Sequence, residues 1–253
     1  MKNELLHIGP LTVYGYGLMM ACALLTAYFT AEYRARKEGF PAEHIFGMFL
    51  CCIFGGFAGA KLLFLITEWK YFIKDPLYYL RTFSDGFVVY GGILAGFLSI
   101  YLYCREKGLR FPAWTDLLMP SVALAQGIGR IGCFLAGCCY GKETSLPIGI
   151  TFKNSDFAPN GVRLLPTQLI SAGLDILLYV ILLKISSRKK RDGEVTAWYF
   201  ILYSIGRFFV EFLRGDRERG FIGSLSTSQF ISILTCAAAV LLLAEGLRRE
   251  KEK

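Results

Sequence analysis

The chain has 253 residues, of which 54% are hydrophobic and 19% are charged, and its mean hydropathy is +0.45. A soluble domain of this length is normally less apolar, so the composition indicates an integral membrane protein. The net charge of +8 fits basic clusters that lie against anionic lipid headgroups, and it gives no reason to expect a nucleic acid partner.

Seven stretches are long and apolar enough to cross a hydrocarbon core of about 30 Å, which takes roughly 20 helical residues. We therefore predict an all-α integral membrane protein with seven transmembrane helices. Because the connections are short, residues 1–253 are expected to form a single polytopic membrane domain. The predicted spans are 9–31, 44–67, 86–104, 114–137, 166–185, 195–213 and 226–246.

Lysine and arginine residues gather in four clusters, and all four fall on the same side of a seven-span chain. The positive-inside rule makes that side cytoplasmic, so we predict an N-terminus outside and a C-terminus in the cytoplasm. The clusters are Arg34, Arg36 and Lys37; Arg105, Lys107 and Arg110; Arg188, Lys189, Lys190 and Arg191; and Arg248, Arg249, Lys251 and Lys253.

Three outer connections carry distinct patterns. Residues 68–85 place Trp and Tyr rings around Pro76, which is typical of a segment in the headgroup layer and predicts one wall of a lipid entrance. Residues 138–165 contain a short alternating patch and then turn residues, which predicts a small extracytoplasmic hairpin or loop between the fourth and fifth helices. Residues 214–225 form a charged outer loop.

Five charged side chains are expected at membrane depth, away from the ends of the predicted spans. An ionised side chain at the centre of a bilayer costs about 2.5–3.5 kcal/mol on insertion scales. These groups must therefore be paired, hydrated or both. They are Lys61, Arg130, Asp175, Arg207 and Glu211.

The two arginines in this set, Arg130 and Arg207, predict an anion-binding site. Arg207, Glu211 and Arg214 share one helix face, so they can form a self-neutralising chain of ion pairs. Arg130 has no carboxylate at helical spacing in its own span, so either Glu211 or Asp175 reaches it across the bundle or an anionic ligand does. Because a guanidinium binds phosphate with two parallel hydrogen bonds, arginines from two helices predict a cradle for a phospholipid headgroup.

The segment YGGILAG in the third span adds further candidates. Gly91 and Gly92 leave one side of the helix bare, which is most often a device for close helix packing. Tyr90 precedes them and is placed to present a phenol to the same cavity. Tyr16 and Tyr203 are similar candidates.

Five motifs occur in a characteristic order. Together they resemble the prolipoprotein diacylglyceryl transferases, and the resemblance covers nearly the whole chain. The motifs are YGL at 16–18, the Gly91–Gly92 pair, GRIG at 129–132, PTQL at 166–169 and R-x-x-x-E-x-x-R at 207–214.

The resemblance implies a multi-pass enzyme of the bacterial cytoplasmic (inner) membrane. Such an enzyme moves the diacylglyceryl group of phosphatidylglycerol onto a cysteine thiol of a lipoprotein precursor, forms a thioether and releases glycerol phosphate. The expected partners are therefore a phospholipid and a lipoprotein precursor or another thiol acceptor. No cofactor and no metal are expected.

The resemblance also assigns roles to individual residues. The predicted catalytic residues are Arg130, Arg207, Tyr90 and Glu211. The predicted substrate-binding residues are Tyr16, Lys61, Gly91, Gly92, Gly129, Gly132, Cys133, Cys138, Gly141, Gln168, Tyr203 and Arg214.

The sequence departs from the family pattern at several of these positions. Tyr90 stands where the family has the histidine of H-G-G, a proposed general base. Cys133, Ala136 and Cys138 stand where Asn, Asn and Glu are expected. Two alternatives therefore stay open: a divergent transferase with another acceptor, and a non-catalytic phospholipid-binding protein or transporter. The lack of an internal repeat disfavours a transporter.

Cys133, Cys138 and Cys139 lie on the predicted outer side, which is the more oxidising one. They can pack or form a disulfide, or Cys133 or Cys138 can act as a nucleophile that accepts the lipid unit. A zinc site is disfavoured because the C-x4-C-C spacing lacks paired ligands and a nearby histidine.

Overall fold

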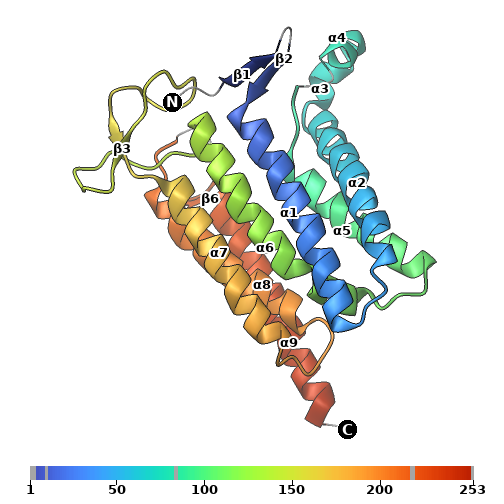
Figure 1. The fold of residues 1–253 in the computed structure, drawn as a ribbon. Helices are drawn as coiled ribbons and strands as arrows, with labels where there is room; N and C mark the ends of the chain where they lie inside the picture. The colour runs from blue at the N-terminus through green and yellow to red at the C-terminus, as the bar shows by residue number, and fades with distance from the viewer. Residues whose placement is uncertain (1–3, 9–10, 83–84, 217–219, 252–253) are drawn as a thin grey trace. The chain divides into compact units, whose positions relative to one another are not determined.

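The structure is a computed structural model that describes residues 4–8, 11–82, 85–216 and 220–251 (Figure 1). This part of the chain is predominantly helical. Its helices are α1 (Gly15–Glu38), α2 (Glu43–Thr67), α3 (Trp69–Phe72), α4 (Pro76–Arg81), α5 (Val89–Glu106), α6 (Phe111–Ala136), α7 (Thr167–Ser186), α8 (Glu194–Leu213) and α9 (Thr227–Lys251). Three antiparallel ribbons join β1 (Glu4–Ile8) to β2 (Leu11–Tyr14), β3 (Ile150–Thr151) to β4 (Arg163–Leu164), and β5 (Phe221–Ile222) to β6 (Leu225–Ser226).

Each of the seven predicted spans contains a long helix. The third span begins three residues before its helix, the last begins with Ser226 of strand β6, and the first differs most. There the chain forms strand β2 before the helix starts at Gly15, while residues 9–10 lie outside the described part. β-branched Thr12 and Val13 pair with β1, since such residues favour strands. The expectation of helix over residues 11–14 was wrong because apolarity alone does not separate a strand from a helix end.

Within the described residues, four helices are long and apolar enough to cross a membrane by length and composition: α2, α6, α7 and residues Thr227–Glu245 of α9. The chain is therefore a predominantly helical membrane protein. The side chains of the predicted C-terminal basic cluster, Arg248, Arg249, Lys251 and Lys253, lie outside the described part.

Contacts along the chain divide it into two compact units. The first comprises Met1–Ala31 and Thr115–Lys253, and the second comprises Glu32–Trp114. The first contains most of α1 and α6 together with α7, α8 and α9. The second contains α2 to α5.

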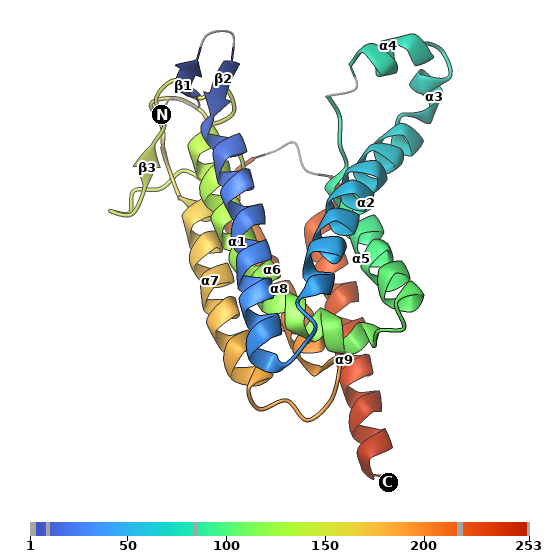
Figure 2. The ribbon, with the colours of Figure 1, turned by 45° about the vertical axis from the view of Figure 1, so that its right-hand side comes forward.

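In the second unit, α2 and α5 lie side by side (Figure 2). A Cβ atom at Gly59 or Gly91 would overlap the backbone of the other residue, so neither position accepts a side chain without movement. Gly92 similarly faces the carbonyl oxygen of Gly56. The two backbones meet directly, as expected for small-residue helix packing.

The segment predicted for the headgroup layer folds as the short helices α3 and α4, while residues 83–84 lie outside the described part. The carboxylate of Asp75 accepts a hydrogen bond from the backbone N–H of Tyr78 at 3.0 Å and so caps α4. Trp69, Tyr71 and Tyr78 are all more than half exposed. Their rings are available to a membrane interface.

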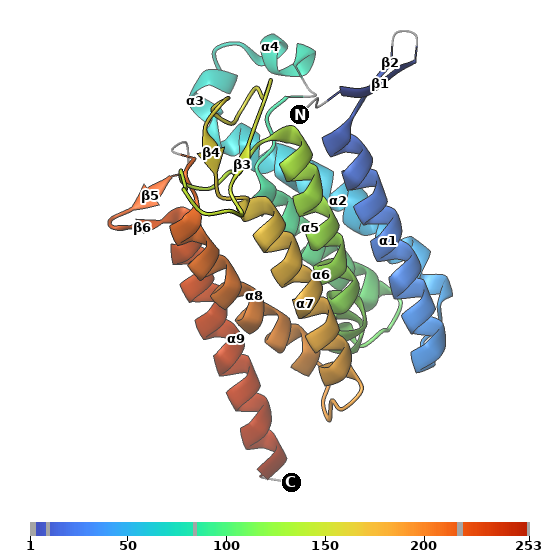
Figure 3. The same ribbon diagram turned by 60° about the vertical axis from the view of Figure 1, so that its left-hand side comes forward.

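In the first unit, α7 and α9 pack on either side of α8 (Figure 3). The hydroxyls of Ser204 and Thr235 join α8 to α9 at 2.8 Å. On α6, a Cβ at Gly127 would lie 3.2 Å from the carbonyl oxygen of Ala172. Glycine therefore permits α6 and α7 to approach closely at the depth of the predicted site.

A buried carboxylate on α6 fixes the start of α8. Asp116 is fully buried and accepts hydrogen bonds from the backbone N–H groups of Gly193 and Thr196, both at 2.9 Å. It also accepts the Thr196 hydroxyl at 2.8 Å and the Lys189 ammonium at 3.2 Å. The carboxylate thus satisfies amides that the helix itself leaves open at its N-terminus.

The two predicted outer loops are built around short ribbons. β3 pairs with β4, over a small core that includes Phe134, Phe152 and Leu164, so the expected hairpin between the fourth and fifth helices is present. The charged loop contains β5 and the first residue of β6, and its residues 217–219 lie outside the described part.

Candidate functional site

A cavity of about 210 Å³ lies in the first unit, between α6, α7 and α8. Most of its wall is aliphatic, and five polar or charged side chains, the smallest of them Ser171, interrupt that wall. The aliphatic residues include Leu174, Leu177, Leu178, Ile181, Leu202, Ile205 and Val210. The largest polar groups are Arg130, Asp175, Tyr203 and Arg207. Two guanidinium groups from different helices therefore reach one hollow, as the sequence predicted.

Arg130 enters this cavity from α6. Among the residues that the structure describes, its guanidinium has no hydrogen-bond or ion-pair partner. It is close enough to Tyr203 and Asp175 to interact with them electrostatically. Of the three partners that the sequence left open for Arg130, neither carboxylate forms a direct ion pair with it, so an anionic ligand has donors available.

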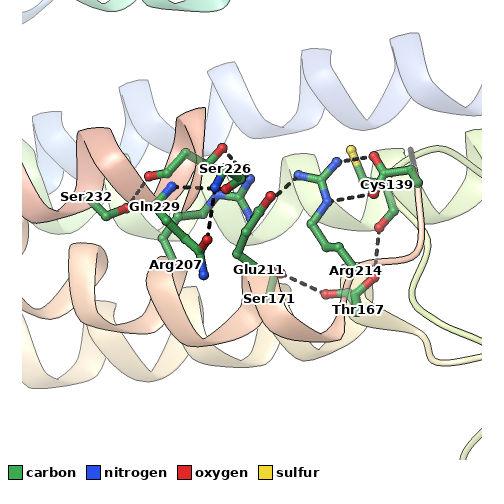
Figure 4. Close-up of polar contacts among 11 residues, drawn as sticks. Cys139, Thr167, Ser171, Arg207, Glu211, Arg214, Ser226, Gln229 and Ser232 are labelled. Carbon is green, nitrogen blue, oxygen red and sulfur yellow. Dashed lines mark hydrogen bonds and ion pairs between the residues drawn. The ribbon is translucent and has the colours of Figure 1, made fainter. Parts of the chain in front are cut away.

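Arg207 has two partners, and Figure 4 shows it near one of them, Glu211. Its guanidinium lies 2.8 Å from the Glu211 carboxylate and donates a hydrogen bond to the Ser228 hydroxyl at 2.9 Å. Glu211 also lies 3.7 Å from the guanidinium of Arg214. The predicted chain of ion pairs on one face of the sixth long helix is confirmed.

Arg214 ends this chain just beyond α8. Its guanidinium binds the Asp216 carboxylate through two nitrogens. Burial opposes the charged form of Arg214, but the hydrogen bond to Asp216 and the nearby negative groups outweigh it, so the pKa of Arg214 is raised. Arg214 therefore remains a fixed cation.

Asp175 is the carboxylate of the cavity. It comes from the middle of α7 and is 5% exposed. Within the described residues, its Oδ2 atom has no hydrogen-bond partner, although both Arg130 and Arg207 interact with it electrostatically. From the sequence, Asp175 was recognised as a charge at membrane depth but was not assigned to the site. The pattern that could have identified it is a single acidic residue in the apolar middle of a helix.

Tyr203 is placed in the cavity by a ring stack. Its ring lies parallel to that of Tyr199, with centroids 5.7 Å apart. The Tyr199 hydroxyl in turn donates to the side-chain oxygen of Gln126 on α6 at 2.7 Å. Tyr199 and Gln126 were missed by the sequence reasoning, although the four-residue spacing of the two tyrosines puts them on one helix face.

The turn after α6 brings Cys138 and Cys139 to the start of α7. Gly137 and Cys139 both have positive φ, 80° and 58° respectively. The Gln168 amide donates to the carbonyl of Cys138 at 2.7 Å, and the Thr167 hydroxyl donates to that of Cys139 at 2.8 Å. Gln168 therefore holds this turn.

Gly141 continues the same turn. It bridges to Arg214, and a Cβ there would lie 2.5 Å from the carbonyl oxygen of Leu165. The backbone of Leu165 thus approaches Gly141 too closely for a side chain at this position. This packing explains why the residue is glycine, and no contact with a ligand is needed to explain it.

The thiols of Cys133, Cys138 and Cys139 come together. All three sulfur atoms lie within 4.8 Å of one another and are half-buried. All eight cysteines are free thiols. Hydrogen bonds from the other two thiols, with Arg214 and Arg130 nearby, lower the pKa of the Cys139 thiol. Gly137 and Cys139, both with positive φ, fold the segment back on itself and so bring the three thiols together.

α1 covers this side of α6. A Cβ at Gly132 would lie 3.1 Å from the Cβ of Met19 and 3.4 Å from the carbonyl oxygen of Tyr16. Gly129 faces the sulfur of Met20 at 3.6 Å. Tyr16 itself is 42% exposed. Gly129 and Gly132 therefore act as packing positions for α1.

The remaining candidates belong to the second unit. Lys61 is 5% exposed, donates to the carbonyl oxygen of Asp85 at 2.7 Å and lies over the rings of Phe64 and Phe87. Gly91 and Gly92 face α2, as described above. Tyr90, at the start of α5, is 39% exposed. The predicted substrate contacts of these residues stay predictions.

Comparison with known proteins decides the family. The family model described as prolipoprotein diacylglyceryl transferase matches residues 3–245. The chain belongs to this family. A phosphatidylglycerol–prolipoprotein diacylglyceryl transferase from Clostridium tetani is 48% identical over 242 residues, which is 96% of each chain. The Clostridium perfringens protein named phosphatidylglycerol–prolipoprotein diacylglyceryl transferase 2 is 43% identical over 96% of this chain and 94% of its own. A Finegoldia magna protein with the first name is 34% identical over the same shares.

The resemblance drawn from the motifs is thereby confirmed. Within this diacylglyceryl transferase, the GRIG motif supplies Arg130 on α6, and the R-x-x-x-E-x-x-R motif supplies Arg207, Glu211 and Arg214 on α8 and its C-terminal end. Ser228 had no sequence signal, because it reaches Arg207 only through the packing of α9 against α8.

Proposed function

We propose that this chain transfers the diacylglyceryl group of phosphatidylglycerol to a cysteine thiol of a lipoprotein precursor. Family membership over nearly the whole chain and the names of its relatives support this activity. The observation that carries it is the cavity on α6, α7 and α8, where Arg130 and Arg207 meet an aliphatic wall. This combination matches a phosphodiester attached to hydrocarbon.

Arg130 is the primary phosphate ligand in this proposal. It has no hydrogen-bond or ion-pair partner among the described residues, so it can offer its donors to a phosphate without breaking an existing hydrogen bond. Arg207 contributes a second positive charge, which Glu211 and Ser228 hold in place. The leucines of α7 lie beside the part of the lipid nearest the glycerol.

The reaction forms one bond and breaks one. The thiol sulfur forms a C–S bond with the glycerol carbon that carries the phosphate, and the C–O bond to that phosphate breaks. Glycerol phosphate leaves with the bonding electron pair. Arg130 and Arg207 stabilise the negative charge that builds on the leaving phosphate, which is the main source of rate enhancement in such preorganised sites.

The thiol proton needs an acceptor, and Tyr90 replaces the histidine expected in the family pattern. We assign this role to Asp175, because its buried carboxylate lines the cavity and has an oxygen without a hydrogen-bond partner among the described residues. Tyr203 lines the same cavity, and we propose that it contacts the substrate there. Glu211 positions Arg207 and does not touch the lipid.

Most of the other predicted substrate-binding residues fall into three groups. Gln168, Gly141 and Arg214 shape the turn that contains Cys138, and Tyr16, Gly129 and Gly132 place α1 against α6. In the second unit, Lys61, Gly91 and Gly92 support α2 and its contacts. We propose that these residues act on the substrates through the walls that they build.

We also propose that all seven long helices cross the bacterial cytoplasmic (inner) membrane as one polytopic domain, with the N-terminus outside and the C-terminus in the cytoplasm. The basic clusters on alternate connections support this orientation. Single cysteines introduced in a background without cysteine, at Lys107 and at Lys153, should react differently with a membrane-impermeant maleimide in intact cells. Labelling at Lys153 alone is expected; labelling at Lys107 alone would reverse the topology.

The activity is tested with the purified full chain in mixed micelles of detergent and phosphatidylglycerol. A synthetic peptide with one lipobox cysteine should gain the mass of a diacylglyceryl group, with release of one glycerol phosphate for each product. Matched reactions contain phosphatidylcholine as the only lipid, or the same peptide with serine in place of cysteine. Lipid binding without any modified peptide would instead support the non-catalytic phospholipid-binding alternative.

A further inference from the structure

A cluster of three thiols, two of which interact electrostatically with Arg130, has no part in the proposed transfer. The sulfur atoms of Cys133, Cys138 and Cys139 lie within 4.8 Å of one another. In a tetrahedral zinc site the metal–sulfur bond is about 2.3 Å, so two coordinating sulfurs stand roughly 3.8 Å apart. The upper limit of 4.8 Å on the sulfur–sulfur distances exceeds this spacing by only about 1 Å.

The backbone that produces this cluster is held at several points. Cys133 belongs to the last turn of α6, and Gly137 then reverses the chain with a φ of 80°. Cys139 takes a φ of 58°, which is uncommon for a residue with a Cβ. Side chains of Thr167 and Gln168 hold the carbonyls of the two later cysteines from α7. The three sulfurs are therefore preorganised by contacts outside their own loop.

Charges around the cluster suit a metal bound by thiolates. Three thiolates around a divalent ion leave a net charge of −1 in a region of low dielectric. Arg130 interacts electrostatically with Cys133 and Cys139, and Arg214 interacts with Cys139. The guanidinium groups offset the excess negative charge.

We propose that Cys133, Cys138 and Cys139 form a binding site for a thiophilic metal ion of the Zn²⁺ class, with a fourth coordination position open. Thiolates are soft ligands, and they select zinc and Cu(I) over magnesium, calcium and manganese. Binding replaces three S–H bonds by three metal–sulfur bonds and releases three protons to the solvent, so no oxidant or reductant is needed. The bound ion fastens the turn after α6, which contacts α7 and Arg214.

The test uses Co²⁺ as a spectroscopic probe for the reduced full chain in detergent without added phospholipid. One Co²⁺ per chain should bind, with the intense thiolate-to-cobalt absorption, and Zn²⁺ should displace it. Cys133→Ser, Cys138→Ser and Cys139→Ser should each weaken binding at least tenfold, while Cys236→Ser on α9 serves as the matched control and should bind as the unchanged chain does.

A second measurement needs no variant and so does not depend on the folding of the serine variants. Zn²⁺ should protect all three cysteines, but not Cys236, from alkylation mapped by peptide mass spectrometry. Absence of the thiolate–cobalt absorption in the reduced chain, or alkylation of the three cysteines at unchanged rates with Zn²⁺, overturns the proposal. Because neither measurement involves lipid transfer, its failure is distinct from failure of the proposed activity.

Discussion

Two cations within apolar helices, one in each unit of this protein, have opposite surroundings. Lys61 in α2 is satisfied inside its own unit by the carbonyl oxygen of Asp85 and the rings of Phe64 and Phe87. Arg130 in α6 lines a cavity and has no hydrogen-bond or ion-pair partner among the described residues. A buried charge whose partners come from the fold supports the fold, whereas one that faces a hollow without a partner indicates a ligand.

The two units also differ in how closely their helices pack. α2 and α5 meet backbone to backbone through glycines, which leaves no room between them. α6, α7 and α8 enclose a cavity with a charged wall. The comparison shows that glycines allow α2 and α5 to pack without a gap. Between α6, α7 and α8, by contrast, the side chains leave a cavity.

The largest effect is expected for Arg130→Ala. Loss of a charged donor that stabilises the leaving phosphate should lower kcat about 10²–10³-fold, while circular dichroism shows unchanged helix content. Peptide modification measured by mass spectrometry checks this value. Arg36→Ala provides the matched control, because Arg36 is exposed and pairs with Glu32; equal activities of the two variants would remove Arg130 from the site.

Glu211→Gln should have the next largest effect. Gln keeps the shape but removes the charge that holds Arg207 at 2.8 Å, and a hydrogen bond between charged groups contributes about 1.5–3 kcal/mol. We expect kcat to fall about tenfold or more. KM for phosphatidylglycerol should change less, because Arg130 still binds the phosphate. A variant in which only KM rises would instead place Glu211 at the lipid.

Gly91→Ala tests the closed helix pair. The added Cβ would overlap the carbonyl oxygen of Gly59, and such overpacking typically costs about 1–3 kcal/mol. We expect a lower Tm in detergent. Thermal unfolding monitored by intrinsic fluorescence measures this Tm. Gly17→Ala is the control, since no atom lies within 4 Å of its added Cβ. Should Gly91→Ala match that control in Tm but lose lipid binding, Gly91 would be a substrate contact.

Lys61→Met should have the smallest effect on catalysis. Met fills a similar volume but loses the hydrogen bond to Asp85, which contributes about 1 kcal/mol. We expect a modest fall in Tm and less than a tenfold loss of kcat/KM. A loss as large as that of Arg130→Ala would show that Lys61 also acts on the substrate, and the contrast between the two cations would disappear.

The helical pattern was readable from the sequence because long apolar segments must form helices in a membrane, where no water satisfies the backbone. The strand at Leu11–Tyr14 was not readable, since its pairing with β1 depends on a partner segment. The motif arginines were also predictable, because a guanidinium inside an apolar span requires compensation wherever the span lies. Asp175 was visible as a charge, but its position in the cavity was not.

The sequence by itself determined which segments are helical, which charges are buried and, through its motifs, the family. Only the tertiary structure decided that Arg130 and Arg207 line the same cavity and that Ser228 and Glu211 bind the Arg207 guanidinium. It alone also brought three cysteines together. The physical reason is that burial is a local property of residue type, whereas the meeting of side chains depends on how glycines, turns with positive φ and helix contacts bring distant segments together.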